Sequence, residues 1–301
     1  MRPLFRGLLW GIVGLLVLGH VAGGWYFSAQ LIERGFEPTP DAIEVPQGDY
    51  QLVEVVYPSP LGDMEAWHLP APGNVWVIHV HGTGATPAEA EHLFAPIQQA
   101  GYPQLAITFR NDAGQPEDPS GYYQYGLTEW NDVAGAVDFA KANGATGIVF
   151  SGFGSGASHI LAYMYRHNLE ENLGVFMDSP NIDMGDTVDF RISMEPVPVL
   201  PITVPPTVAE IARFFTSLQI GVNWRSIDYV RDAGVTLHAP ALLQHGTADA
   251  SVPISQSVAF TEANPDLARL VTYDGAGHVQ LYEADPEKYL REVLGFLSEV
   301  S

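Results

Sequence analysis

Residues 147–159 read GIVFSGFGSGASH, and this stretch decides the fold. Residues 147–150 form an apolar run of the kind found in buried strands, and an apolar helical run follows at 158–167. Between them lies Gly152-Phe153-Gly154-Ser155-Gly156, which has the spacing of the nucleophile elbow G-x-S-x-G. The elbow needs small residues two before and two after its centre, because strand and helix pass very close there. The stretch therefore predicts a strand, a tight turn and a helix at the carboxyl edge of a sheet.

The centre of this elbow is glycine, where a nucleophile would stand. Gly152 and Gly156 satisfy the two small positions around Gly154. Moving the frame to Ser155 puts Phe153 at a small position, where it fits poorly. An elbow residue has positive φ, which costs a residue with a Cβ about 1–3 kcal/mol and glycine almost nothing. We therefore predict an intact turn at Gly154, with Ser155 as a nucleophile only if the turn is adjusted.

Strand-like and helix-like runs alternate on both sides of the elbow. Strands are predicted at 52–56, 75–80, 104–109, 147–150, 173–177, 241–244 and 270–273, and helices at 88–100, 127–142, 158–167 and 286–297. Such alternation predicts an α/β fold, with a mostly parallel central sheet flanked by helices on both faces.

The alternation stops for about 60 residues between the strands at 173–177 and 241–244. This segment holds five prolines, at 196, 198, 201, 205 and 206, and then an amphipathic stretch at 208–218. We interpret residues 181–237 as a small cap insertion over the carboxyl edge of the sheet. A rigid linker between two domains is the alternative, although no second core follows it.

Three groups of residues follow predicted strands and could carry chemistry. Thr83 lies in a glycine turn after 75–80, where its backbone N–H and that of Ser155 could form an oxyanion hole. Asp249 follows 241–244 and His278 follows 270–273. An acid that orients a histidine, and a histidine that reaches the elbow, are the partners of an activated serine. We predict Asp249, His278 and Ser155 as catalytic residues, with Gly154 at the elbow position.

Several motifs in order resemble the α/β-hydrolase family over about residues 50–300, and more closely a serine-aminopeptidase-like or lysophospholipase-like branch found in actinobacteria. The motifs are Val80-His81-Gly82, Arg110-Asn111-Asp112, Tyr125-Gly126-Leu127-Thr128-Glu129-Trp130-Asn131-Asp132, Asp178-Ser179-Pro180, His245-Gly246-Thr247-Ala248-Asp249 and Gly277-His278. The resemblance implies an α/β-hydrolase fold, attack of a serine on an ester, thioester or amide carbonyl, and no cofactor. Members usually show Gly-Trp-Ser-Met-Gly-Gly, whose serine aligns with Gly154.

Composition excludes some classes of partner and site. The formal charge of −22 makes nucleic acid an unlikely partner, since phosphates would be repelled. The absence of cysteine excludes disulfides, thiolate metal sites and a thiol nucleophile. We expect His79, His81, His159 and His167 to be structural, because no carboxylate cluster joins them, and we expect no metal.

The N-terminal segment is predicted to be a single-pass membrane anchor. Arg2 and Arg6 precede an uncharged run at 7–27, about the length that spans a bilayer. The positive-inside bias places the N-terminus in the cytoplasm and the folded domain outside. A cleaved signal peptide is the alternative, because small residues lie at 21–24. We divide the chain into an anchor with its juxtamembrane segment at 1–35 and a hydrolase domain at 36–301.

Two functions remain open from the sequence. The first is a membrane-anchored hydrolase of ester, acyl or related carbonyl substrates, with Ser155 displaced into the nucleophile role. The second is a non-catalytic fold of the same type that binds an apolar ligand or an envelope protein, because Gly154 lacks a hydroxyl. A weaker third reading has His278 and Asp249 activate a water molecule in the space that the missing side chain leaves.

Overall fold

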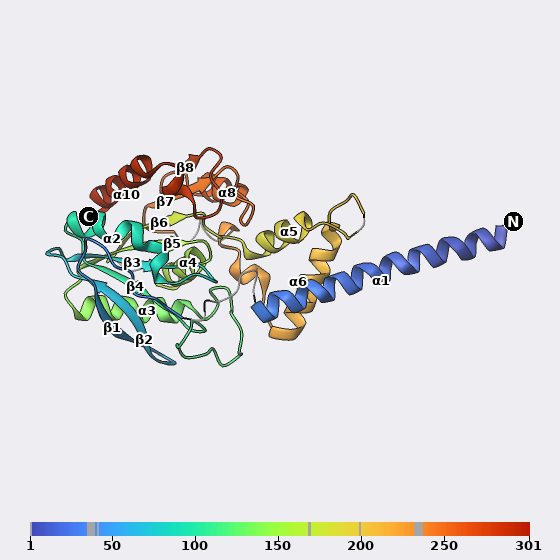
Figure 1. Cartoon of the computed structure of the whole chain (residues 1–301), viewed down its shortest axis with the longest axis horizontal. Helices are drawn as coiled ribbons and strands as arrows, with labels where there is room; N and C mark the ends of the chain where they lie inside the picture. Colours follow the sequence, from blue (N-terminus) through green and yellow to red (C-terminus); the bar gives the residue numbers. More distant parts are fainter. Residues whose placement is uncertain (1, 35–39, 41, 168–169, 199, 232–236) are drawn as a thin grey trace.

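The structure is a computed structural model that describes all residues except 1, 35–39, 41, 168–169, 199 and 232–236. Its strands are β1 (Val53–Ser59), β2 (Gly62–Leu69), β3 (Val75–Val80), β4 (Gln104–Ile107), β5 (Gly147–Phe153), β6 (Asn172–Asp178), β7 (Ala241–Gly246) and β8 (Ala268–Tyr273). The strands form one sheet in the order β1-β2-β4-β3-β5-β6-β7-β8. β3 to β8 run parallel to one another, whereas β1 and β2 form an antiparallel hairpin at one edge (Figure 1). The prediction of a mostly parallel sheet is thus confirmed, and β2 is a strand that the sequence analysis did not identify.

Helices cover both faces of the sheet, as predicted. One face carries α3 (Trp130–Ala142), α4 (Gly156–Arg166) and α8 (Ser255–Ala263), and the other carries α2 (Glu91–Gln99), α9 (Leu281–Ala284) and α10 (Pro286–Val300). Each face of the sheet carries its own hydrophobic core under these helices. The buried residues of β5 alternate between the two cores. Ile148 and Phe150 pack under α3 and α4, and Val149 packs under α2 and α10. A strand buried on both faces reads as a continuous apolar run, which is the pattern at 147–150.

The segment between β6 and β7 is the one interpreted from the sequence as a cap, and it is called the cap below. It contains α5 (Met184–Met194), α6 (Pro206–Ile220) and the short 3-10 helix η2 (Trp224–Ile227). Figure 1 shows α5 and α6 beyond the carboxyl edge of the sheet, beside the N-terminal helix.

The N-terminal helix α1 (Arg2–Arg34) is longer than the apolar run that predicted it. Its final third packs on α6, where Gly24 lies so close to Ile211 that a Cβ would come within 2.3 Å of that side chain. Ser28 Oγ forms a buried 3.0 Å hydrogen bond with Thr216 Oγ1, and Leu31 joins the core. The end of the segment predicted as an anchor thus also contributes to the packed domain.

The rest of α1 projects away from the domain (Figure 1). Arg6–Ile32 is long and apolar enough to cross a membrane, and its most apolar part is almost wholly exposed. A signal sequence near an N-terminus has the same features. The helix continues without a break through residues 21–24, the predicted cleavage region of the alternative reading.

Candidate active site

The elbow turn joins the end of β5 to the start of α4. Gly154 has a φ of +48°, and its N–H donates to the carbonyl of Asp178 at 3.0 Å. A Cβ on Gly152 would lie 2.9 Å from Ala157 Cα, and one on Gly156 would lie 2.1 Å from Val80 O. Backbone atoms cannot give way as a flexible side chain can, so these two positions require glycine. The geometry therefore places Gly154, rather than Ser155, at the centre of the elbow.

Asp249 and His278 lie together above this turn. His278 Nδ1–H donates to Asp249 Oδ2 at 2.8 Å, and the carboxylate also accepts the backbone N–H groups of Ser251 and Val252. Burial raises the pKa of Asp249, but hydrogen bonds from His245 and His278 outweigh this effect and hold the pKa well below its usual value. The acid is ionised at neutral pH and fixes the histidine tautomer with Nε2 as an acceptor.

The other ring nitrogen of His278 faces the elbow. The position that a Cβ on Gly154 would take lies 3.1 Å from His278 Nε2 and 3.6 Å from Cε1. Asp249 and His278, the residues predicted as acid and base, thus lie together over the residue that lacks a hydroxyl. His278 itself comes from the loop after β8, where Val279 N–H donates to Ser179 Oγ at 3.0 Å.

The side chain of Ser155 points toward Thr83. Its Oγ accepts the backbone N–H of Thr83 at 2.7 Å and lies 2.8 Å from Thr83 Oγ1. Ser155 is 8% exposed and directly precedes α4. Its hydroxyl therefore takes the Thr83 N–H that the sequence analysis assigned to an oxyanion.

A cavity of about 860 Å³ opens above these residues. Sheet-edge loops supply one wall, and α5 of the cap supplies Met184, Thr187 and Arg191. Tyr125 and Glu89 also line the cavity, and neither they nor the cap residues were identified as site residues from the sequence. The one sequence signal that could have pointed to Tyr125 is its place in the motif at residues 125–132, which was used for the family resemblance.

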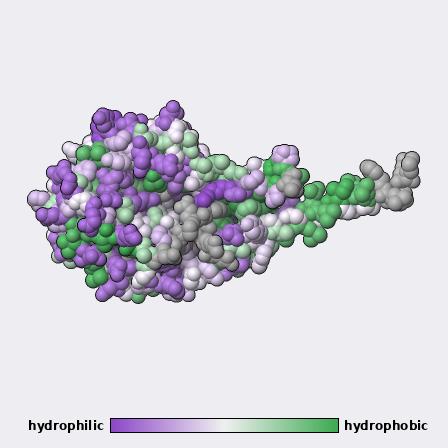
Figure 2. Space-filling view, viewed as in Figure 1, coloured by the Kyte–Doolittle hydropathy of each residue, from purple (hydrophilic) through white to green (hydrophobic). Residues whose placement is uncertain are grey.

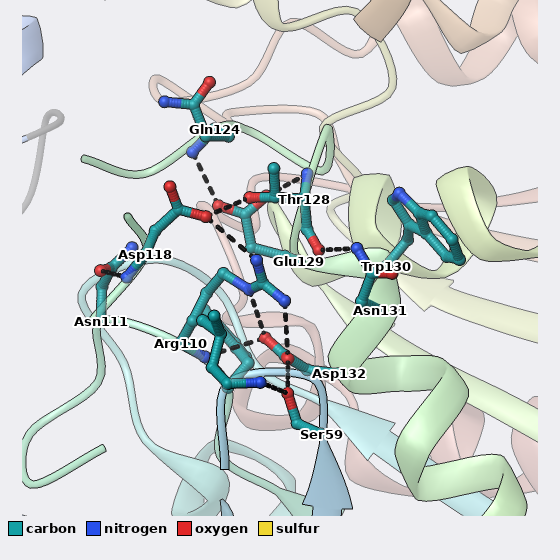
Figure 3. A network of polar contacts seen from close by, with 12 residues as sticks. Ser59, Arg110, Asn111, Asp118, Gln124, Thr128, Glu129, Trp130, Asn131 and Asp132 are labelled. Carbon is teal, nitrogen blue, oxygen red and sulfur yellow. Dashed lines mark hydrogen bonds and ion pairs between the residues drawn. The ribbon is translucent and has the colours of Figure 1, made fainter. Parts of the chain in front are cut away.

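A buried polar network holds the loop that carries Tyr125 (Figure 3). Arg110 makes two parallel bonds to Asp132, Nε to Oδ2 at 2.8 Å and Nη2 to Oδ1 at 3.0 Å. Its Nη1 bonds Asp118 Oδ2 at 3.0 Å, within the same loop. Side-by-side Arg–carboxylate bonds fix both groups in one orientation. The network therefore ties residues 111–129 to the end of β4 and to α3.

Glu129 completes that attachment next to Tyr125. Its carboxylate accepts the backbone N–H groups of Gln124 at 2.7 Å and Gly126 at 2.8 Å. These bonds bracket Tyr125, which adopts a positive φ of 54°. Positive φ is costly for a residue with a large side chain. The motif 125–132 therefore serves to hold one strained residue against the cavity.

Asp178 is a second buried carboxyl group beside the elbow. It lies at the end of β6, and its Oδ1 accepts the hydroxyl of Ser179 at 2.9 Å. Burial raises the pKa of Asp178 to about 7, against the smaller opposing effects of Ser179 and His278. The sequence analysis used this residue only as part of a motif.

Three of the four histidines that were expected to be structural, His79, His81 and His159, lie in the core. Burial lowers the pKa of His79 to about 4 and that of His159 to about 3, so both are neutral at pH 7. His81 Nε2 lies 3.1 Å from Asp112 Oδ2. Within the described part of the chain, no three histidine or carboxylate side chains are grouped to hold a metal ion.

No known protein family and no curated protein matches this sequence. Many solved structures do, among them an esterase of Pyrococcus furiosus with a TM-score of 0.66 and 20% identity, over 87% of this chain and 97% of the other. A thermophilic esterase from Thermogutta terrifontis matches with a TM-score of 0.58 and 17% identity, over 83% and 99% of the two chains. A membrane phospholipase A, described as a bacterial virulence factor, matches with a TM-score of 0.59 and 18% identity, over 100% of this chain and 99% of the other. At these identities the likeness shows the fold, which is of the α/β-hydrolase type that the motifs implied.

Proposed function

We propose that this chain is a membrane-anchored protein that binds an acyl or ester ligand in the cavity above Gly154, without forming an acyl-enzyme. The structures it resembles include esterases and a phospholipase, and the cavity is of the size that holds small ligands, about 300–1,000 Å³. The ligand class rests on that likeness and on the position of the cavity over the elbow.

One observation carries the proposal. The elbow holds glycine directly beneath His278, and the hydroxyl of the next residue, Ser155, is held by Thr83 N–H. A covalent intermediate needs a nucleophile within reach of the base and a free oxyanion donor. Here residue 154 has no side-chain oxygen, and the Thr83 N–H already bonds Ser155. A bound ester therefore meets no serine aligned for attack.

We also propose that α1 anchors the chain, with its N-terminus in the cytoplasm and the folded domain outside. The basic residues precede the apolar run, which agrees with the positive-inside bias. Gly23 and Gly24 lie against Val208 and Ile211 of α6, so cleavage at 21–24 would cut the helix where it docks, which supports an anchor that stays attached.

Hydrolysis is the second candidate, and the Asp249–His278 pair favours it. In this reading His278 Nε2 removes a proton from a cavity water while the water oxygen attacks the ester carbonyl. The proton then passes to the leaving alkoxide as the tetrahedral adduct collapses to acid and alcohol. Direct attack by Ser155 would require its hydroxyl to leave Thr83 and turn toward His278.

Binding and turnover of 4-nitrophenyl butyrate by the full chain in detergent micelles separate these readings. We expect ligand-detected NMR to show binding, and Ala250→Trp, at an exposed position on the cavity wall, to abolish it. Ala100→Trp, at an exposed position at the end of α2, is the matched control and should bind normally. Absence of binding by the native chain would refute the proposal.

A fluorophosphonate that traps activated serines decides about covalent chemistry. We expect peptide mass spectrometry to find no adduct on the native chain. An adduct on Ser155 would instead establish a hydrolase with a shifted nucleophile. Ester turnover above the buffer rate that disappears in His278→Asn, without any adduct, would establish the water mechanism.

A further inference from the structure

A second cavity of about 880 Å³ lies between α1 and the cap. On α1 it is lined by Leu15, Leu16, Gly19, His20, Gly23, Tyr26, Phe27 and Gln30, all within the candidate membrane span Arg6–Ile32. The segment 196–205 is here called the proline loop. The opposite wall is formed by its described residues Pro196, Val197, Pro198, Leu200, Ile202, Val204 and Pro205, together with Arg191 and Ile192 of α5. One wall of this groove is thus a helix of the length and composition that cross a bilayer.

The cap presents unusual apolar exposure beside this helix. Leu200 and Ile202 of the proline loop are each 54% exposed. Other exposed apolar side chains of the cap are Met194, Phe214 and Leu218. Figure 2 shows hydrophobic surface along the projecting part of α1 and on the cap where the helix leaves the domain. Adjacent apolar side chains on a surface mark a contact with a partner or a membrane.

The proline loop is suited to a medium without water. Residues 196–209 carry no charged side chain, and prolines at 196, 198, 201 and 205 remove four backbone donors. The described donors of Val197, Leu200 and Val204 are paired with the carbonyls of Ile202, Val197 and Glu195. Backbone groups exposed to hydrocarbon must be satisfied internally, and the prolines and these three bonds reduce the number of loop N–H groups that need a partner.

The groove also adjoins the cavity above Gly154. Arg191 on α5 lines both cavities, so the groove meets the ligand site at a cationic side chain. A guanidinium matches the geometry of a phosphate. A molecule with an apolar tail in the groove would bring a polar head to Arg191 and the ester linkage between them toward the cavity.

We infer that the groove holds an acyl chain of a bilayer phospholipid, and that the proline loop is inserted in the membrane beside α1. This inference rests on the proposed anchor and acyl site, and it identifies the ligand class as a membrane lipid that enters sideways from the bilayer. The length of α1 along the groove, from Leu15 to Gln30, and the exposure of Leu200 and Ile202 favour lipid as the occupant.

Photo-cross-linking in phosphatidylcholine vesicles tests this inference with the full chain. The vesicles contain phosphatidylcholine with a diazirine in one acyl chain, and peptide mass spectrometry maps the adducts. We expect adducts on the proline loop and on residues 15–23. Leu200→Asn with Ile202→Asn should lower the adduct yield on the loop by about fivefold or more, because amide side chains enter hydrocarbon poorly.

The matched control substitutes two apolar residues of similar exposure far from the cap. Val53 and Val56 on β1 are 51% and 56% exposed, and Val53→Asn with Val56→Asn should leave the adduct yield unchanged. Equal yields in the two double variants, or adducts confined to α1, would overturn the inference.

Binding of 4-nitrophenyl butyrate separates failure of this inference from failure of the proposed function. If the native chain binds the soluble ester but the loop carries no lipid adduct, the groove inference alone fails. If the native chain binds neither, the acyl site itself is wrong. The loop variants should bind the soluble ester normally, since neither substituted residue lines the cavity above Gly154.

Discussion

Replacing Gly154 with serine should restore a covalent nucleophile at a predictable cost. The position has a φ of +48°, which costs a residue with a Cβ about 1–2 kcal/mol. The new Cβ would lie 3.1 Å from His278 Nε2, so the imidazole must retreat by a few tenths of an ångström. The His278 side chain is 23% exposed and follows Gly275 and Gly277, so it has room to do so. We expect a total loss of about 1–3 kcal/mol in the free energy of unfolding.

Gly154→Ala is the control that separates backbone strain from chemistry. It introduces the same Cβ without a hydroxyl, so it should lose nearly the same stability and gain no reactivity. Thermal unfolding measures the first quantity, and the rate of fluorophosphonate labelling measures the second. We expect labelling at residue 154 in the serine variant alone.

The hydrogen bond between Ser155 and Thr83 predicts a further difference between variants. Its hydroxyl engages Thr83 N–H, so the oxyanion donor is not available to a new serine at 154. One such donor contributes about 10²–10³-fold to the rate. Gly154→Ser with Ser155→Ala should therefore be labelled at least about tenfold faster than Gly154→Ser alone. Folded variants without labelling at residue 154 would refute the reasoning, because they would show that His278 does not reach the elbow.

Three further outcomes follow from the buried polar groups. Arg110→Met leaves Asp132 buried without its partner and should cost about 3–5 kcal/mol in thermal unfolding, whereas Lys141→Met, at an exposed ion pair, should cost under about 1 kcal/mol. Because burial raises the pKa of Asp178 to about 7, the folded state binds the proton more tightly than the unfolded state; stability should fall by as much as about 4 kcal/mol as pH rises from 4 through 7. Asp178→Asn should flatten that pH profile, and an unchanged profile would assign the effect elsewhere. Ser155→Ala leaves Thr83 N–H without its acceptor, so it should lower stability by about 1 kcal/mol and tighten binding of 4-nitrophenyl butyrate, measured by titration.

Much of the fold could be predicted because buried strands and helices have characteristic local patterns of apolar residues. A strand buried on both faces must be apolar throughout, and β5 is, so residues 147–150 indicated its place. The hairpin of β1 and β2 was only half recognised. The pairing of Tyr57 with Met64 across the turn is a tertiary fact, and β2 places exposed Asp63 and Glu65 among its buried residues, which weakens the signal.

The sequence also determined which residue stands at the elbow. The spacing of Gly152 and Gly156 sets the frame through backbone sterics alone, and the close approaches of Ala157 and Val80 show the same constraint in space. Likewise, the order of Asp249 and His278 after successive strands places both at one edge of a parallel sheet, whatever the rest of the chain does.

Only the tertiary structure decided where hydroxyls, cavity walls and surfaces lie. Ser155 bonds Thr83, 72 residues away, and no local pattern encodes the direction in which a side chain at a helix start turns. Arg191 reaches both cavities because the cap folds back over the sheet edge. The docking of α1 on α6 depends on the fit of Gly24 against Ile211. Contacts between distant segments depend on how whole elements pack, whereas strand, turn and helix signals depend on neighbours along the chain. The sequence therefore indicated the scaffold and the glycine at the elbow, and only the structure showed the bond from Thr83 N–H to Ser155 and the groove beside α1.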